Sequence, residues 1–317
     1  MTVSKFERFA VRRPLRDSGL PAVDGRQSPP MIYMSSGQVA EAGVYVELAW
    51  ITGIPQPHPL LAAAQVLDHD QVLLHIGMDP RTPQVLGGTV ELHLGGQPIV
   101  FNTTTAVFIP KGTPYGRLRW REFTHPHLQV CIVLGSGDPY GTAGRPGAGG
   151  RPAAAAAPAP VAGGAGAKVD YEQYVVRSPM REAGPDYVEG RQNPTMTYMS
   201  GIQVPGVKDY IEFGWIWQVP SSRIPKMRHD NFDELVLHIG SDPGDPEDLG
   251  ATMQIGVGED LLEFDTTHCA FFPRELDHGP LIWNEVRRPM IEFAMMLGAA
   301  NWAQGWDGSF FEESDGS

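Results

Sequence analysis

The sequence predicts an all-β protein, and three observations support that fold class. Glycine and proline, the residues of tight turns, contribute 37 and 29 of the 317 residues. Between the turns lie short runs of aromatic and β-branched residues in which apolar and polar positions partly alternate. The third observation is that the same series of runs and turns occurs twice along the chain. Strands are therefore expected at 44–51, 72–76, 89–94, 210–219, 235–239 and 291–296, with helical periodicity only at 294–302.

The internal repeat is sustained over more than a hundred residues in each copy. Gly25-Arg26-Gln27 in the first copy corresponds to Gly190-Arg191-Gln192 in the second, at an offset of 165 residues. Beyond a loop the offset becomes 163, and the four residues 74–77 (Leu-His-Ile-Gly) recur at 237–240. A spacing kept over this length indicates a tandem duplication, so two domains of the same fold are expected.

A segment rich in glycine, alanine and proline separates the two copies at 136–168. Such a composition has little apolar surface to bury and is typical of an extended linker. The predicted organisation is therefore an N-terminal lobe at 1–135, the linker at 136–168, and a C-terminal lobe at 169–317.

The composition excludes several classes of function. The net charge of −13 repels phosphate backbones, which disfavours nucleic-acid binding. Two cysteines, Cys131 and Cys269, cannot build a disulfide framework or a cysteine-ligated zinc site. No apolar run is long enough to span a bilayer, and no signal peptide precedes the first copy, so a cytoplasmic protein without a membrane partner is expected. The expected partner is a small molecule, and a homodimer is the protein assembly to test.

Two short motifs resemble those of the cupins. The first cupin motif is His-x-His, then three or four residues, then Glu and an apolar strand ending in glycine. In this chain His229 precedes Glu234 by five residues, and the apolar run 235–240 ends in glycine. The second motif places a histidine about five residues after a strand-closing proline, as His278 follows Pro273. The resemblance covers about 120 residues of each copy and implies two tandem cupin double-stranded β-helix (jelly-roll) barrels, a bicupin.

The resemblance also implies a metal near the centre of the second lobe. The first histidine of the first motif falls on Met227, which leaves His229, Glu234 and His278 as ligands. Two imidazoles and one carboxylate are the ligand set of non-haem Fe(II), which is the favoured metal. Mn(II), Ni(II) and Zn(II) are alternatives, because affinity order does not choose among these ions. His238 shares a strand face with Glu234 and is a second-choice ligand, the other interpretation being a buried core histidine.

Comparison of the two copies separates structural from chemical candidates. Val66, Gln71 and Tyr115 occupy the positions of the three predicted ligands in the first copy, so that lobe is expected to hold no metal. The alternative is that the histidines of the second copy are ordinary surface residues and both lobes are empty. Arg26 and Arg191 occur in both copies, so we expect each to pack an arm against a neighbouring lobe rather than to act in catalysis.

Three further residues are candidate catalytic groups. His268 occurs only in the second copy and is expected to line the pocket or its rim. Trp217 is a candidate pocket wall, with core packing as the alternative. Arg228, flanked by Arg223 and Lys226, is a candidate for binding an anionic substrate group through charge-assisted hydrogen bonds, with a solvated loop as the alternative.

The function expected from the resemblance is that of a metal-dependent cupin enzyme acting on a small, anionic organic molecule. O₂-dependent oxidation at a site of two histidines and one carboxylate is the leading expectation. One alternative is a non-redox isomerase, decarboxylase, lyase or cyclase in which the metal is a Lewis acid and His268 or His278 transfers a proton. A second alternative is a bicupin that binds a small molecule without catalysis.

Overall fold

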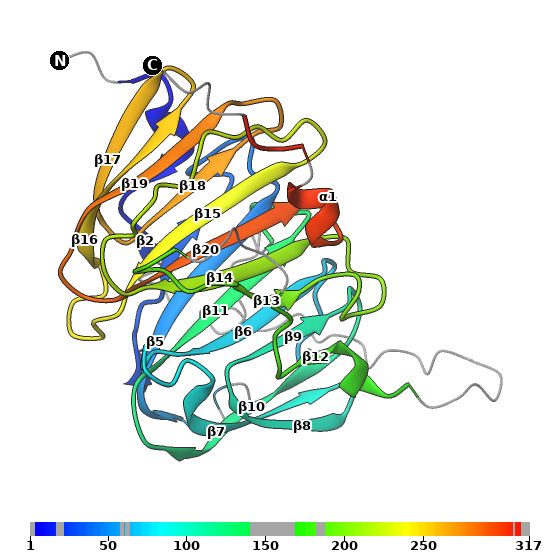
Figure 1. The fold of residues 1–317 in the computed structure, drawn as a ribbon. Helices are drawn as coiled ribbons and strands as arrows, with labels where there is room; N and C mark the ends of the chain where they lie inside the picture. The colour runs from blue at the N-terminus through cyan, green and yellow to red at the C-terminus, as the bar shows by residue number, and fades with distance from the viewer. Residues whose placement is uncertain are drawn as a thin grey trace.

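The computed structural model describes residues 4–16, 22–57, 60, 64–139, 169–181, 188–306 and 308–311. Nearly all of its regular structure is β, arranged in two lobes (Figure 1), and the predicted fold class is confirmed. Most of the predicted linker, 140–168, lies outside the described residues. Among the described residues, no helix has the length and apolar character needed to cross a membrane.

Each lobe is a sandwich of one large and one small antiparallel sheet. In the N-terminal lobe the large sheet has the order β12-β9-β6-β11-β5-β4-β2, with β3 on β5, and the small sheet has the order β10-β7-β8. Their bounds are β2 Leu15–Arg16, β3 Asp24–Arg26, β4 Met31–Met34, β5 Val44–Gln56, β6 Gln71–Gly77, β7 Val85–Leu94, β8 Gln97–Thr103, β9 Thr105–Ile109, β10 Tyr115–Phe123, β11 His127–Leu134 and β12 Val175–Val176.

The C-terminal lobe repeats this arrangement. Its large sheet has the order β1-β18-β15-β20-β14-β13 and its small sheet β17-β16-β19. The bounds are β1 Ala10–Val11, β13 Met196–Met199, β14 Tyr210–Ile216, β15 Asp233–Gly240, β16 Asp248–Val257, β17 Asp260–Thr266, β18 His268–Phe272, β19 His278–Val286 and β20 Met290–Leu297. Two 3-10 turns, η1 Glu7–Phe9 and η3 Tyr171–Tyr174, and the helix α1 Trp302–Trp306 complete the described elements.

The helical stretch expected at 294–302 is wrong. Residues up to Leu297 belong to β20, and the helix begins only at Trp302. Adjacent residues of β20 point to opposite faces of the sheet. Met295 enters the large apolar core that the two lobes share, described below, and Met296 enters a separate cluster that packs against Trp306 of α1. That two-residue alternation is the period of a strand.

One apolar core joins the two lobes. It is formed by the outward faces of both large sheets and includes Val46 and Trp50 of β5 together with Phe213 and Trp215 of β14. Trp50 and Trp215 are both buried, as predicted. Since the other face of each large sheet packs against a small sheet, the central strands are buried on both faces. This explains why β6 and β15 appear in the sequence as nearly continuous apolar runs.

The lobes also exchange their N-terminal arms. Strand β1, from the start of the chain, pairs with β18 of the C-terminal lobe, and β12, which follows the linker, pairs with β9 of the N-terminal lobe. In Figure 1 the dark blue N-terminal segment accordingly lies among the orange and yellow strands, and green β12 lies beside the cyan ones. The structural lobes therefore differ from the sequence copies, since each sheet is completed by the arm of the other copy.

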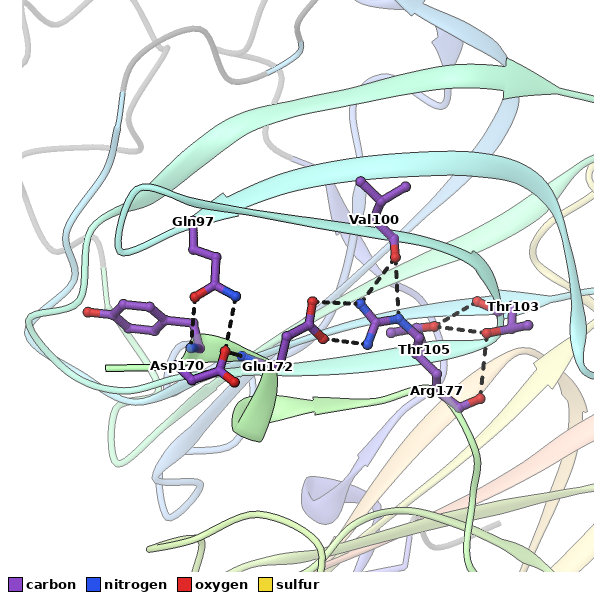
Figure 2. Close-up of polar contacts among 8 residues, drawn as sticks. Gln97, Val100, Thr103, Thr105, Asp170, Glu172 and Arg177 are labelled. Carbon is purple, nitrogen blue, oxygen red and sulfur yellow. Dashed lines mark hydrogen bonds and ion pairs between the residues drawn. The ribbon is translucent and has the colours of Figure 1, made fainter. Parts of the chain in front are cut away.

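The second arm is anchored just before η3 and just after β12 (Figure 2). Asp170 accepts a hydrogen bond from the Gln97 side chain at 3.1 Å. Arg177 forms an ion pair with Glu172 at 2.6 Å and donates to the carbonyl oxygen of Val100 at 3.1 Å. These contacts connect a segment after the linker to β8 and hold β12 at the sheet edge.

The first arm repeats the same contacts at matching positions. Arg12 forms an ion pair with Glu7 at 2.8 Å and donates to the carbonyl oxygen of Glu263. The Thr266 hydroxyl donates to the carbonyl oxygen of Arg12 at 3.1 Å. Both copies of the module therefore use an arginine next to a short strand to hold an arm on the opposite lobe.

The turn at Gly95 and Gly96 tests the arm contact. Both glycines have positive φ, but a Cβ on Gly95 would collide with the Tyr171 ring of the second arm, whereas a Cβ on Gly96 would meet nothing. Gly96→Ala should cost only the left-handed strain of about 1–2 kcal/mol, while Gly95→Ala should destabilise the protein further by displacing the arm. Urea unfolding should therefore show a lower midpoint for Gly95→Ala than for Gly96→Ala. Equal midpoints would show that the arm contributes nothing there.

Candidate metal centre and adjoining cavity

Three side chains from separate segments meet inside the C-terminal lobe. Met227 and His278 exchange backbone hydrogen bonds, from each amide to the other's carbonyl, at 2.7 and 2.9 Å. This pairing places His229 beside the start of β19, and Glu234 enters from the start of β15. One potential ligand atom from each of His229, Glu234 and His278 lies within 4.8 Å of the others. The three predicted ligands are therefore brought together.

The two imidazoles converge on one carboxylate oxygen. Glu234 Oε2 lies 2.8 Å from Nε2 of His278 and 3.3 Å from Nε2 of His229. The three residues are exposed by only 1–3%. Because water is excluded, each of these polar groups depends on the others or on a bound ion for its partner.

The opposite ring nitrogens are tethered to oxygen atoms. Nδ1 of His278 lies 2.9 Å from the carbonyl oxygen of Leu276, which can only accept a hydrogen bond. Nδ1 of His229 lies 3.0 Å from the Ser309 hydroxyl, which itself donates to the carbonyl oxygen of Gly305. Both Nδ1 atoms therefore act as donors, and both Nε2 atoms face Glu234. A bound metal would take the place of the proton that each Nε2 donates to that carboxylate. Such support of ligand histidines from outside the ligand set orients the rings and is typical of metal sites.

Glu234 remains a carboxylate in this environment. Burial acts to raise its pKa, but the hydrogen bonds from His229 and His278 outweigh burial and lower the pKa to about 2. A carboxylate and two oriented imidazoles form a donor set that fits a divalent transition metal, and they supply fewer ligands than such ions take.

The corresponding residues of the N-terminal lobe make other contacts. Gln71 donates its side-chain amide to Cys131 Sγ at 2.8 Å, and the Tyr115 hydroxyl donates to Gln65 at 3.3 Å. Val66 is largely exposed. The expectation that this lobe holds no metal stays a prediction.

His238 and His268 form a pair away from the ligand cluster. His238 Nδ1 lies 3.1 Å from His268 Nε2, and His268 Nδ1 lies 2.7 Å from the carbonyl oxygen of Thr266. Burial lowers the pKa of both, that of His268 to about 3, so both rings are neutral. His238 does share a strand face with Glu234, but four residues of strand separate them by roughly 13 Å. The structure therefore corrects both assignments: His238 lies outside the ligand set, and His268 packs on Phe264 with ring centroids 3.9 Å apart.

Arg228 and Trp217 also lie elsewhere than predicted. Arg228 alternates with the inward-facing Met227 and His229, so it points to solvent, where it pairs with Asp230 at 2.9 Å. Trp217 follows the end of β14, is 41% exposed, and donates its indole N–H to the carbonyl oxygen of Pro80 in the N-terminal lobe at 3.3 Å. The solvated loop, given above as the alternative for Arg228, is the arrangement observed, and Trp217 contacts the other lobe instead of walling a pocket.

A cavity of about 350 Å³ opens beside the candidate metal centre. Its walls come from the segment before β13, from β14, from the loop before Met227 and from the C-terminal segment. Trp306 belongs both to the cavity wall and to the surroundings of the cluster, since its ring is edge-on to that of His229 with centroids 6.0 Å apart. The lining residues are Val188, Arg191, Thr195, Glu212, Ser222, Arg223, Ile224, Pro225, Trp302, Trp306 and Phe310.

The polar wall of the cavity contains groups that the sequence analysis missed. Arg191, expected to pack an arm, instead faces the cavity and lies 3.3 Å from Glu292. Glu212 accepts hydrogen bonds from the Tyr210 hydroxyl at 2.9 Å and from the Thr195 hydroxyl at 3.0 Å. The repeat did distinguish the two lobes here: the first copy has the neutral Gln129 at the position that corresponds to Glu292 of the second copy.

Glu212 is poised between its two protonation states at neutral pH. Burial raises its pKa to about 7, although the hydrogen bonds from Tyr210 and Thr195 and the charge of Arg191 act in the opposite direction. Burial also raises the pKa of Glu292. Carboxyl groups with such perturbed pKa values in a cavity are typical of proton-transfer sites.

The raised pKa of Glu212 predicts a pH-dependent effect on stability. The folded-state pKa of about 7 exceeds that of an unfolded glutamate, so ionisation costs stability as pH rises through the interval between them. Glu212→Gln removes that cost, and its stability relative to wild type should rise between pH 5 and pH 8 by up to about 3 kcal/mol. Urea unfolding at both pH values measures this difference. The exposed Glu285→Gln serves as the control, and its stability relative to wild type should not change between the two pH values. If the relative stability of Glu212→Gln also stayed constant, the raised pKa of Glu212 would be contradicted.

Comparisons with known proteins agree on the architecture. No protein-family model and no curated protein sequence matches the chain. Among solved structures, AerE from Microcystis aeruginosa matches with a TM-score of 0.52 and 11% identity over 92% of this chain and 99% of that one. Bacillus subtilis oxalate decarboxylase, determined at pH 4.6, matches with a TM-score of 0.55 and 10% identity over 96% of this chain and 78% of that one. Both are cupin-fold proteins, and the chain has the duplicated cupin fold of a bicupin.

Proposed function

We propose that the C-terminal lobe is a metal-dependent enzyme that acts on a small anionic organic molecule. The observation that carries this proposal is the buried cluster of His229, Glu234 and His278, whose ligand atoms lie within 4.8 Å of one another. The cavity with Arg191 and Arg223 in its wall supports an anionic substrate.

O₂-dependent oxidation is the chemistry that this donor set favours. A divalent metal such as Fe(II), when held by two imidazoles and one carboxylate, supplies Lewis acidity and electrons for O₂ chemistry and keeps open positions for substrate and oxygen. The chain's own contribution is to hold both Nε2 atoms toward Glu234 through Leu276 and Ser309. On the cavity side, the Trp306 ring lies edge-on to that of His229 and gives the cluster an apolar neighbour.

A non-redox reaction with proton transfer is the second candidate, and Glu212 favours it. Its carboxyl lines the cavity and its pKa of about 7 allows it to accept or deliver a proton at neutral pH. The proton-transfer role considered for His268 moves to Glu212, because His268 is buried against Phe264 and hydrogen-bonded at both ring nitrogens.

The metal content of purified protein tests the proposal. The variants introduce residues that the same fold carries at the equivalent positions of the first copy. Glu234→Gln and His278→Tyr introduce the residues that the first copy carries at those positions, Gln71 and Tyr115. Protein purified without chelators should contain close to one transition-metal ion per chain, and either substitution should remove most of it. His238→Gln should retain the metal, because that residue lies outside the cluster. Wild-type protein without metal, even after reconstitution with each of the four ions, would refute the proposal.

The type of reaction is tested on metal-loaded protein with small carboxylic acids. Oxidation predicts oxygen consumption that Glu234→Gln abolishes. Proton transfer predicts deuterium incorporation from D₂O without oxygen uptake, and this incorporation should fall at least tenfold in Glu212→Gln. Binding of an acid with neither reaction would favour the non-catalytic bicupin.

A further inference from the structure

We infer that the cavity beside the metal centre binds a small carboxylic acid that carries an aromatic ring. This inference rests on the proposed function and names the substrate class of the same site. Charged groups form one wall of the cavity, aromatic side chains form another, and each wall is held by contacts of its own.

The charged wall contains two arginines with different surroundings. Arg191 is almost buried, with 11% of its side chain exposed, and its Nε lies at an ion-pair distance of 3.3 Å from the Glu292 carboxylate. Arg223 lies in the exposed loop across the cavity. A guanidinium group recognises a carboxylate through paired N–H donors, and such charge-assisted hydrogen bonds strengthen where water is excluded.

The aromatic wall comes from the C-terminal segment. Trp302 and Trp306 are four residues apart on α1 and therefore share one face of the helix. Phe310 stacks on Trp306 with ring centroids 5.3 Å apart and an angle of 3° between the rings. Because Trp302 and Phe310 remain exposed by 38% and 43%, this wall has apolar surface left for a ligand ring to cover.

The cavity volume limits the size of the ligand. A volume of about 350 Å³ is near the lower end for small-molecule sites. It suits a single ring with a short acidic side chain, and is small for a nucleotide or an oligomer. The apolar lining from Val188, Ile224 and Pro225 agrees with a ligand that is mostly hydrocarbon.

The two lobes differ in how they use the repeated arginine. In the N-terminal lobe Arg26 contacts Glu47 at 3.3 Å and donates to the neutral Gln129 at 3.2 Å. In the C-terminal lobe Glu292 replaces that glutamine and contacts Arg191. Glu212 accepts from the Tyr210 hydroxyl, as Glu47 does from that of Tyr45, and in addition from the Thr195 hydroxyl. A ligand carboxylate on this wall would raise the pKa of Glu212, so binding at pH 8 should take up a fraction of a proton.

Calorimetric titration of the full chain tests the inference, with benzoate, phenylacetate and 3-phenylpropanoate as probes. Both EDTA-treated and metal-loaded protein are titrated. At least one probe should bind, and its neutral alcohol analogue should bind at least tenfold more weakly. Arg223→Gln should weaken binding tenfold or more, and Trp302→Leu should weaken it severalfold. Arg287→Gln removes the same charge from an exposed site outside the cavity and should change affinity less than twofold.

Proton uptake is measured at pH 8 from the binding enthalpies in phosphate and Tris buffers. Wild type should take up protons on binding, and Glu212→Gln should not. No binding by any probe, or binding that Arg223→Gln leaves unchanged, would overturn the inference. Acid binding to a protein that holds no metal would sustain this inference while the proposed function fails. Metal binding without acid binding would overturn this inference alone.

Discussion

The apolar core between the two lobes is the constraint on which the rest of the structure depends. The outward faces of both large sheets are buried in it, so each central strand has its other face directed into its own lobe. Successive residues of a strand point to opposite faces of the sheet. Because Leu235 and Leu237 enter the shared core, Glu234 and His238 face the inside of the C-terminal lobe. Buried polar groups require partners, and for Glu234 these are the two imidazoles.

The two copies keep the same arm contacts but differ in the side chains that line the inside of each lobe. Arg12 and Arg177 hold the exchanged arms in the same way in both copies. At the ligand positions, by contrast, the N-terminal lobe has Gln71 and Tyr115, which contact Cys131 and Gln65, and Val66, which faces solvent. The candidate metal centre and the cavity therefore depend on a few substitutions within a repeated framework, and the first lobe contributes mainly the shared core and one arm.

The sequence predicted the features that depend on spacing. The repeat offset predicted two similar lobes, and the resemblance of two short motifs to those of the cupins implied the cluster of His229, Glu234 and His278. Predictions that depended on side-chain direction outside a strand were wrong, as for Arg228 and Trp217. An arm packed against a neighbouring lobe was expected at Arg26 and Arg191, whereas the exchanged strands are β1 and β12, beside Arg12 and Arg177. Arg191 and Glu212 were missed because both recur in the first copy, as Arg26 and Glu47, and residues shared by the two copies were assigned to the fold.

Anomalous diffraction from crystals of the metal-loaded protein tests the central claim most directly. The account predicts one anomalous peak per chain, bonded to Nε2 of His229, Nε2 of His278 and a carboxylate oxygen of Glu234. It predicts no peak at His238. A loaded crystal with no peak at the cluster, or with the metal bound at the pair of His238 and His268, would contradict it.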